Sequence, residues 1–390
     1  LQGSLRVIAV PTYLCMLIQH PMFWCAAMLM AGTALGLYYP LPYYLPLLVV
    51  TVVVSTLLRR YGHWHDVLTL FVWLLIGCSR ASISYGEDDA PRWQQTISSK
   101  AKAVQSSMIR RLSKSGVSDR TLALTQALIV GKKDDLSRET QQAYRQVGAS
   151  HLLALSGMHL GILYSLLYFC LVRWVRHSRW RWYFLPLILF SLWGYALVAG
   201  MPVSLVRAAL MLSVITITTL MQYRTDPLHP LALSAIIILF VEPMQLFSIS
   251  FQLSYAAVLF LLLMWGPVND LFPRQNWAIR LFTVSCIATL GTMPLTLYYF
   301  HQLPLLGPLL SLILIPLTTV IIWLTLATIL LPVSAFGWVL NYIVILQEKI
   351  LNYAGSIPYT TLTDIYPDEI SIMLLYAAML VAIVRLRTRN

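Results

Sequence analysis

The stretch from Leu305 to Leu331, LLGPLLSLILIPLTTVIIWLTLATILL, contains no charged residue and is long enough to decide the class of fold. A hydrocarbon layer about 30 Å thick is crossed by roughly 17 to 25 apolar residues in an α-helix. Apolar stretches of similar length recur along the chain, whereas the alternating segments of about ten residues that build a membrane barrel are absent. The sequence therefore predicts an all-α membrane protein, a polytopic helical bundle of about 10–12 membrane segments, of which the short or Gly/Pro-broken ones are candidates for re-entrant segments.

Composition supports the same class of protein. Of the 390 residues, 58% are hydrophobic and 11% are charged, whereas an ordinary soluble domain carries about 25% charged residues. A chain of this composition cannot cover a surface that faces water on all sides. The expected membrane segments are, in chain order, Met22–Leu37, Tyr44–Leu58, Val67–Ile83, His151–Val172, Trp182–Ala199, Val203–Met221, Leu228–Val241, Leu246–Trp265, Ile279–Phe300, Leu305–Leu331, Phe336–Ile350 and Ile370–Val384.

The formal net charge of +12 would favour nucleic-acid binding in a soluble protein, but here loops that face the cytoplasm explain much of it. Arginines gather in the loops around Arg59, Arg176, Arg224 and Arg274 and after Arg385, and all of these fall on one side if every segment spans. The positive-inside rule assigns that side, with both termini, to the cytoplasm. The five cysteines are odd in number and show no CxxC spacing, so they predict neither a disulfide framework nor a metal site.

Polarity divides the chain into three regions. Residues 1–83 are expected to form an N-terminal three-helix membrane region, residues 84–147 an external polar segment with short helices, and residues 148–390 the remaining membrane segments. The middle region is the only long polar stretch, and it is long enough to escape the positive-inside rule.

Within the polar segment, the pattern predicts a helix over Thr121–Val130, a turn over Gly131–Asp135 and a second helix that Ser137 caps. Basic residues of this segment could recruit phosphates outside the membrane, with an affinity that falls as salt rises. A solvated loop face explains them equally well. The candidate external DNA contacts are Arg110, Arg111, Lys132 and Lys133.

The segment Gly148–Gly161, GASHLLALSGMHLG, places polar side chains inside an apolar stretch. On a continuous helix with about 100° per residue, His151, Ser156 and His159 would fall within an arc of about 140° and could face one lumen. Ser156 and Gly157 also favour a local break, because glycine weakens a helix by about 1 kcal/mol and serine offers the backbone a competing partner.

Three interpretations of these side chains stay open. They line a pathway, as ionisable residues in membrane segments usually do. They form ordinary interhelical hydrogen bonds. Alternatively, Ser156 and His159 form the nucleophilic dyad of an intramembrane hydrolase, for which the sequence places no orienting carboxylate. The pathway interpretation is narrowly favoured.

Arg207 lies about five residues into its membrane segment, one turn after Ser204. A lone arginine at the centre of a bilayer costs at least about 2.5 kcal/mol, so its charge needs compensation. A polyanion in a wet pore would provide it, and so would snorkelling to the outer interface. Gln252 in the segment Leu246–Trp265 is a further candidate, although interhelical hydrogen bonding explains it equally well. The predicted pathway comprises His151, Ser156, His159, Ser204, Arg207, Gln252 and Ser254, and no residue is predicted to be catalytic.

Two motif-like stretches do not meet the requirements of the motifs they approach. Gly131-Lys132-Lys133 lacks the first glycine of a phosphate loop and its magnesium-binding Ser or Thr. In His63-Trp64-His65-Asp66 the aspartate is one place early for a dinuclear metal motif, and Leu68 stands where the last histidine belongs. The sequence therefore predicts no cofactor and no bound metal.

Several ordered blocks resemble those of the ComEC competence proteins. The stretch Ala127–Gly161 resembles the signature of that family, which has an ALxxG turn, a short charged helix and the block G-x-x-H-L-L-A-x-S-G-x-H. Gly200–Met211 resembles its G-x-P-x-S-x-x-R-A-x-x-M block. The last block departs from the family at Ser311, where an asparagine is usual. The other family-like blocks, which follow Gly200–Met211 in the chain, are Arg224–Pro230, Ser250–Tyr255, Thr292–Leu295 and Gly307–Pro316.

The resemblance implies an inner-membrane channel that imports one strand of transforming DNA, with residues 148–390 as the competence-type channel domain. It implies single-stranded DNA and membrane lipids as ligands, and a separate DNA receptor, nuclease and cytoplasmic helicase-like translocase as partners. A homo-oligomer is an open option. Full-length relatives also carry an oligonucleotide-binding domain and a metallo-β-lactamase-like domain, and this chain is expected to have neither, which predicts conduction without nuclease or ATPase activity. The alternative is a polytopic transporter or exporter of a small or lipid-like solute, because such a protein would also bury polar groups.

Overall fold

The computed structural model describes residues 21–39, 41, 43–57, 62–84, 92–153, 155–169, 181–222, 226–272, 275–331, 333–357 and 360–388. A helix lies in each of the apolar stretches predicted to enter the membrane. Four of the helices are apolar but shorter, at Tyr44–Thr56, Gly157–Leu167, Tyr183–Val198 and Leu228–Val241. The all-α, multi-pass membrane fold is therefore confirmed. The helices long and apolar enough to cross a bilayer, five within the described residues, are α2 (Pro21–Tyr38), α12 (Val203–Leu220), α14 (Ile249–Leu271), α15 (Trp277–Phe300) and α16 (Gly307–Leu330).

The chain forms two compact units, each assembled from separated stretches of sequence. The first unit takes residues 1–89, 225–272 and 370–390, and the second takes residues 90–224 and 273–369. The three-region division expected from polarity follows a different criterion and stays a prediction. Besides α2 and α14, the first unit contains α3 (Tyr44–Leu57), α4 (Gly62–Ser84), α13 (Leu228–Val241), the 3-10 helix η3 (Pro243–Phe247) and all but the first residue of α18 (Glu369–Thr388).

In the first unit, α2 and α4 cross at glycines that let the two backbones touch. A Cβ atom at Gly32 would lie 1.9 Å from the carbonyl oxygen of Leu74, and one at Gly77 would lie 2.4 Å from that of Leu29. Close approach over small residues is a common way to hold membrane helices together, since the surrounding lipid gives little hydrophobic drive for association. Any larger side chain at either glycine must therefore push the two helices apart.

Arg80 of α4 joins the N-terminal helices to α13 within the same unit. Its Nε donates a hydrogen bond to the carbonyl of Phe240 at 2.8 Å, and Nη2 donates to that of Val241 at 3.3 Å. These carbonyls belong to the last turn of α13, where no intrahelical donor remains for them. The guanidinium therefore caps the C-terminal end of α13, where a cation is also favoured by the helix dipole.

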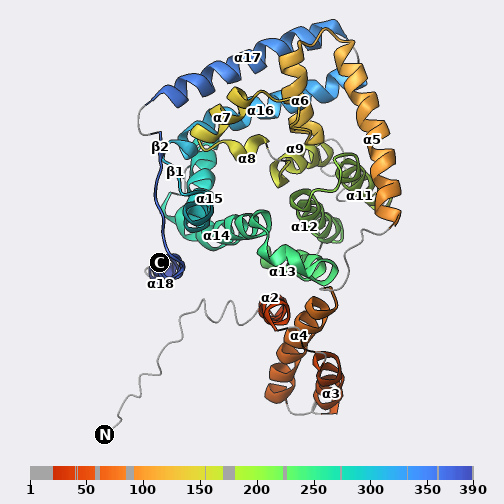
Figure 1. Ribbon diagram of the computed structural model, residues 1–390, viewed down its shortest axis with the longest axis vertical. Helices are drawn as coiled ribbons and strands as arrows, with labels where there is room; N and C mark the ends of the chain where they lie inside the picture. The colour runs from red at the N-terminus through yellow and green to blue at the C-terminus, as the bar shows by residue number, and fades with distance from the viewer. Residues whose placement is uncertain are drawn as a thin grey trace. The chain divides into compact units, whose positions relative to one another are not determined.

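Among the residues that the structure describes, the second unit has two hydrophobic cores. One core is made where α6, α7, α8, α16 and α17 pack together, around Leu124, Leu314 and Val344. The other is made by α9, α11 and α12 around Leu160 and Leu205. Figure 1 shows α16 and α17 side by side, with α5 along an edge of this unit. Besides α12, α15 and α16, the elements are α5 (Arg92–Ser113), α6 (Asp119–Val130), α7 (Arg138–Gln146), α8 (Ser150–Leu153), α9 (Gly157–Leu167), α11 (Arg181–Val198), β1 (Leu303–Pro304), α17 (Ser334–Ser356) and β2 (Thr361–Leu362).

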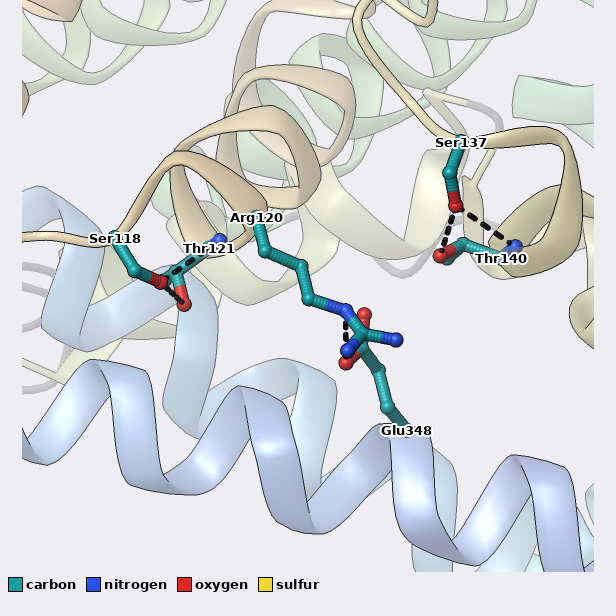
Figure 2. Close-up of polar contacts among 6 residues, drawn as sticks. All are labelled: Ser118, Arg120, Thr121, Ser137, Thr140 and Glu348. Atoms are coloured by element: carbon teal, nitrogen blue, oxygen red, sulfur yellow. Dashed lines mark hydrogen bonds and ion pairs between the residues drawn. The ribbon is translucent and has the colours of Figure 1, made fainter.

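The two short helices predicted in the polar segment start with the same capping device. Ser137 Oγ accepts the backbone N–H of Thr140 at 3.1 Å, and Ser118 Oγ accepts that of Thr121 at 3.4 Å (Figure 2). α6 ends at Gly131, which has a φ of 78° and donates its N–H to the carbonyl of Ala127. The predicted cap and helix end are confirmed. α6 is nevertheless almost entirely buried between apolar helices, so this part of the polar segment belongs to a packed core.

The signature block, residues 148–159, begins with a glycine that is held against a two-stranded sheet. β1 and β2 pair antiparallel, with Leu303 opposite Leu362 and Pro304 opposite Thr361. Gly148 has a φ of 71°, and a Cβ there would lie 2.2 Å from the Cβ of Pro304. Both the positive φ and the close approach demand glycine. This contact holds the start of the signature block against the β1–β2 sheet.

Candidate functional site

The signature block is a broken helix rather than a continuous one. α8 ends at Leu153 and α9 begins at Gly157, and Ser156 between them has an extended backbone. The N–H of Ser156 donates to Nδ1 of His159 at 3.3 Å, and Ser156 Oγ lies 3.1 Å from the same nitrogen. The predicted break at Ser156 and Gly157 is confirmed. The predicted arc shared by His151 and His159 on one continuous helix is wrong, because the chain leaves the helical path between them.

His159 serves as the third residue of a capping box at the start of α9. Since Nδ1 accepts the N–H of Ser156, a neutral ring carries its proton on Nε2. The side chain is 1% exposed, and Nε2 has no hydrogen-bond partner within the part of the chain that the structure describes. The contact with Ser156 has the atoms of a serine–histidine dyad, but helix capping explains it and no described carboxylate orients the ring.

α12 supports the break through a side-chain hydrogen bond. Ser204 Oγ donates to the carbonyl of Leu155 at 2.6 Å, which satisfies an acceptor that the broken helix leaves without a partner. A Cβ at Gly157 would lie 3.3 Å from the Cβ of Ala208, so the first turn of α9 packs closely on α12. The structure therefore brings Ser156, His159 and Ser204 to one place.

Arg207 lies on α12 one turn after Ser204 and directly before Ala208. Its side chain is 2% exposed. An arginine that snorkels keeps its guanidinium at the surface, whereas this one is enclosed by protein. A permanent positive charge is therefore buried in a helix that is long and apolar enough to cross the membrane.

The other predicted pathway residues lie elsewhere. His151 is exposed on α8, with Nδ1 3.1 Å from the carbonyl of Gly148. Gln252 and Ser254 belong to α14 of the first unit, where Gln252 Nε2 donates to the carbonyl of Leu246 and Ser254 Oγ donates to that of Phe251. The predicted lining thus divides between the two units.

The four candidate external contacts differ in whether the side chain already interacts with another part of the protein. Arg111 donates from Nη1 to the carbonyl of Ile329 at 3.3 Å, which commits it to the end of α16. Lys132 forms an ion pair of 3.0 Å with Asp135, and Lys133 is exposed beside it. Arg110 is exposed on α5, where its Nε donates to the carbonyl of Ser106.

Sequence reasoning missed a polar cluster between α6, α7 and α17. Arg120 Nε lies 2.7 Å from Glu348 Oε2 (Figure 2), and both residues line a small pocket together with Glu139, Thr140 and Asn352. The signal was present, because Gln347-Glu348-Lys349 interrupts the predicted segment Phe336–Ile350 and an acid within an apolar segment marks a site by default.

Tyr144 of α7 belongs to the same cluster. Burial, with a smaller contribution from the Glu348 carboxylate, raises the pKa of the Tyr144 phenol. Its hydroxyl and Glu348 Oε1 are both buried without a hydrogen-bond partner among the described residues. Tyr144 therefore stays a neutral hydroxyl in this core.

Among the described residues, no group of three or more metal-ligating side chains comes together. Cys25, Cys78 and Cys286 are free thiols. The side chains of His63, Trp64 and His65 lie outside the described residues, as do Cys15 and Cys170.

Comparison with known proteins places most of the chain in one family. A family model described as Competence protein matches residues 128–389. ComE operon protein 3 of Bacillus subtilis is 34% identical over 197 residues, which are 50% of this chain and 24% of that protein. Recombination protein 2 of Haemophilus influenzae is 29% identical over an alignment of 272 residues that covers 61% of this chain and 34% of that protein. The matches thus span about a quarter and a third of these curated relatives. No solved structure matches.

Proposed function

This chain belongs to the competence protein family, and from that premise we propose that it is an inner-membrane channel that imports single-stranded DNA during natural transformation. The signature block and the block around Arg207 both fall within the residues that the family model matches. Family membership supports DNA as the transported molecule, and the arrangement of α8, α9 and α12 supports a route across the membrane.

The broken helix beside a buried arginine carries the proposal. Irregular backbone at membrane depth is tolerated only where protein buries it or where it lines a wet cavity. α12 contributes Arg207, with its fixed positive charge, and the first turn of α9 contributes His159, with a buried Nε2 donor. An unpartnered buried donor costs about 1–3 kcal/mol, so His159 Nε2 favours an acceptor, and the fixed charge of Arg207 favours an anionic one such as a phosphate oxygen. A strand of any sequence could use such contacts, because they read the backbone and not the bases.

The proposed route is formed by residues of the second unit, and these residues have separate roles. Ser204 and Ser156 hold the break in place, while Arg207 supplies a buried positive charge and His159 a buried donor that favour an anionic strand. Residues 148–390 form the channel region, and a receptor, a nuclease and a cytoplasmic translocase act as separate partners. The proposed lining in the second unit is His151, Ser156, His159, Ser204 and Arg207, and a role for Gln252 and Ser254 of the first unit stays a prediction.

The experiment measures chromosomal transformation in a strain that requires this chain, with the abundance of each variant in the membrane fraction checked in parallel. Arg207→Gln removes the buried charge and should lower transformation at least about tenfold, since one lost charge contact is worth about 1.4 kcal/mol or more. Arg207→Lys should retain part of the activity. Arg145→Gln removes an exposed charge of α7 and serves as the control, with activity close to that of the wild type.

Unchanged transformation by Arg207→Gln at normal abundance would overturn the assignment of the route. Purified protein in liposomes provides the second arm, in which entry of a labelled single strand is compared with entry of small solutes. Entry of the solutes without the strand would favour the transporter alternative.

A further inference from the structure

α5 presents a basic face without a single acidic residue. From Ser99 to Lys114 the helix and its end carry Lys100, Lys102, Arg110, Arg111 and Lys114, and no aspartate or glutamate. In a chain with only 11% charged residues, this is a strong local excess of one sign. A face of this kind attracts a polyanion over distances of about a Debye length, roughly 8 to 10 Å in ordinary salt.

Three of the exposed cations share one side of the helix, and Lys102 lies about 80° beyond Arg110. At about 100° per residue, Lys100, Arg110 and Lys114 fall within about 80° of one another. The opposite side, with Ala101 and Leu112, is buried. The line of charge from Lys100 to Lys114 is about 20 Å long at the helical rise of about 1.5 Å per residue, which is long enough to meet several phosphates.

Hydrogen bonds fix this helix to the second unit and leave the basic side open. Gln105 Nε2 donates to the carbonyl of Val198 at 2.6 Å, at the end of α11, and Arg111 donates to Ile329 at the end of α16. Lys100, Lys102, Arg110 and Lys114 are exposed, and none of them pairs with a carboxylate among the residues that the structure describes. The turn at Lys132 and Lys133 differs, because Asp134 and Asp135 neutralise it.

We propose that this basic face of α5, made of Lys100, Arg110 and Lys114 with Lys102 at its edge, is the surface on which single-stranded DNA docks before it enters the membrane. The assignment rests on the proposed function and replaces Arg111, Lys132 and Lys133 as the principal external contacts. Charge complementarity to the phosphate backbone selects the occupant. Exposed Ser106 and Ser107 add hydroxyl groups between the cations, and no aromatic side chain lies between residues 99 and 114 to stack on bases. Docking therefore reads phosphates and shows no base preference.

An anionic lipid surface is a poorer occupant of this face. Helices that lie on membranes insert a row of large apolar side chains between the lipids. The apolar side of α5 is already used against α6, α11 and α16, and Val104, at 45% exposure, is the one large apolar residue of residues 99–114 left open. The helix is thus built to hold a soluble polyanion.

The test measures binding of a fluorescent oligonucleotide to the purified full chain in nanodiscs of zwitterionic lipid, over a range of potassium chloride. The variant K100Q/K102Q/R110Q/K114Q should bind about 10- to 100-fold more weakly, and the slope of log affinity against log salt should fall by about 2 to 3, because each phosphate contact contributes about 0.7 to that slope. The control R138Q/R145Q/R280Q/K349Q removes four exposed charges of the same unit and should keep both quantities. The half variants K100Q/K102Q and R110Q/K114Q should each give about half of the change, which guards against a folding defect of the fourfold variant.

The outcomes separate the two proposals. Equal loss in the α5 variant and the control would mean diffuse charge, and no loss in either would exclude docking on α5; both results overturn the inference. If the α5 variant loses affinity only in discs that contain anionic lipid, the face binds headgroups and the inference is also overturned. Wild-type protein that binds strands but fails to import them contradicts the proposed function alone.

Discussion

Arg120 of α6 and Glu348 of α17 form an ion pair with unequal surroundings. The Nε–Oε2 distance is 2.7 Å, and the arginine side chain is 62% exposed while that of the glutamate is 8% exposed. Arg120→Gln leaves a buried carboxylate without its cation, whereas Glu348→Gln leaves a cation that water can solvate. We expect Arg120→Gln to lower stability by about 1–3 kcal/mol and Glu348→Gln to cost clearly less, as measured by unfolding midpoints in detergent.

The double variant R120Q/E348Q extends this prediction, since it removes both charges from the cluster. Its stability should exceed that of Arg120→Gln alone, because the cost of the single variant is mainly the uncompensated carboxylate. A double variant less stable than Arg120→Gln, or a larger effect of Glu348→Gln, would contradict the explanation.

The capping box at the helix break predicts a rescue by glutamine. His159→Ala removes the acceptor for the N–H of Ser156 and should cost at least about 1 kcal/mol. His159→Gln restores a side chain that reaches the same N–H, because glutamine at this position completes an ordinary capping box. The unfolding midpoint of His159→Gln should thus lie near that of the wild type.

Transformation by the same glutamine variant separates capping from transport. A stable His159→Gln protein with normal DNA uptake would confine His159 to a structural role, whereas a stable protein with reduced uptake supports its place on the route. If His159→Gln is as unstable as His159→Ala, the ring itself and not its capping contact holds the break.

The glycine crossing of α2 and α4 predicts that one methyl group is destabilising there. Gly77→Ala places a Cβ 2.4 Å from the carbonyl oxygen of Leu29, so the helices must separate, at a cost of about 1–3 kcal/mol. Gly266→Ala in α14 of the same unit meets nothing within 4 Å and should be neutral or stabilising by up to about 1 kcal/mol. The comparison is made on unfolding midpoints, and equal effects of the two variants would refute close packing at Gly77.

Arg80 predicts a local effect at the end of α13. Arg80→Lys keeps the charge but cannot reach the carbonyls of Phe240 and Val241 with a rigid pair of donors. Hydrogen exchange in the last turn of α13 should therefore accelerate in Arg80→Lys almost as much as in Arg80→Ala. Full protection in the lysine variant would show that charge alone is sufficient.

Local features of the fold were predictable from the sequence. Ser137 as a helix cap, the helix end at Gly131 and the break at Ser156 each depend on residues within four positions, where backbone chemistry alone decides. The arc that joined His151 and His159 failed because it extended helical periodicity across the break that Ser156 and Gly157 produce. A periodic pattern describes a face only while the helix continues.

Long-range pairs were not predictable in the same way. Arg120 and Glu348 are far apart in sequence, and no local pattern indicates which of several arginines meets a given acid. The hydrogen bond from Ser204 to Leu155 and the cap that Arg80 gives to α13 depend likewise on how helices pack. The charge of Arg207 was visible from its segment, but its complete burial by protein required the packed structure.

The first compact unit is made of three stretches of sequence that alternate with those of the second unit, so its helices are synthesised at different times. Its N-terminal helices leave the ribosome long before α18, which brings Tyr376 to within 5.9 Å of Phe260, ring centre to ring centre. At about 5 to 20 residues per second, the roughly 280 residues in between take roughly 15 to 60 s. The nascent α2, α3 and α4 must therefore reside in the lipid on their own until α13 is made, and the first unit is complete only when α18 arrives. Their tight glycine crossing lets them hold together through that wait.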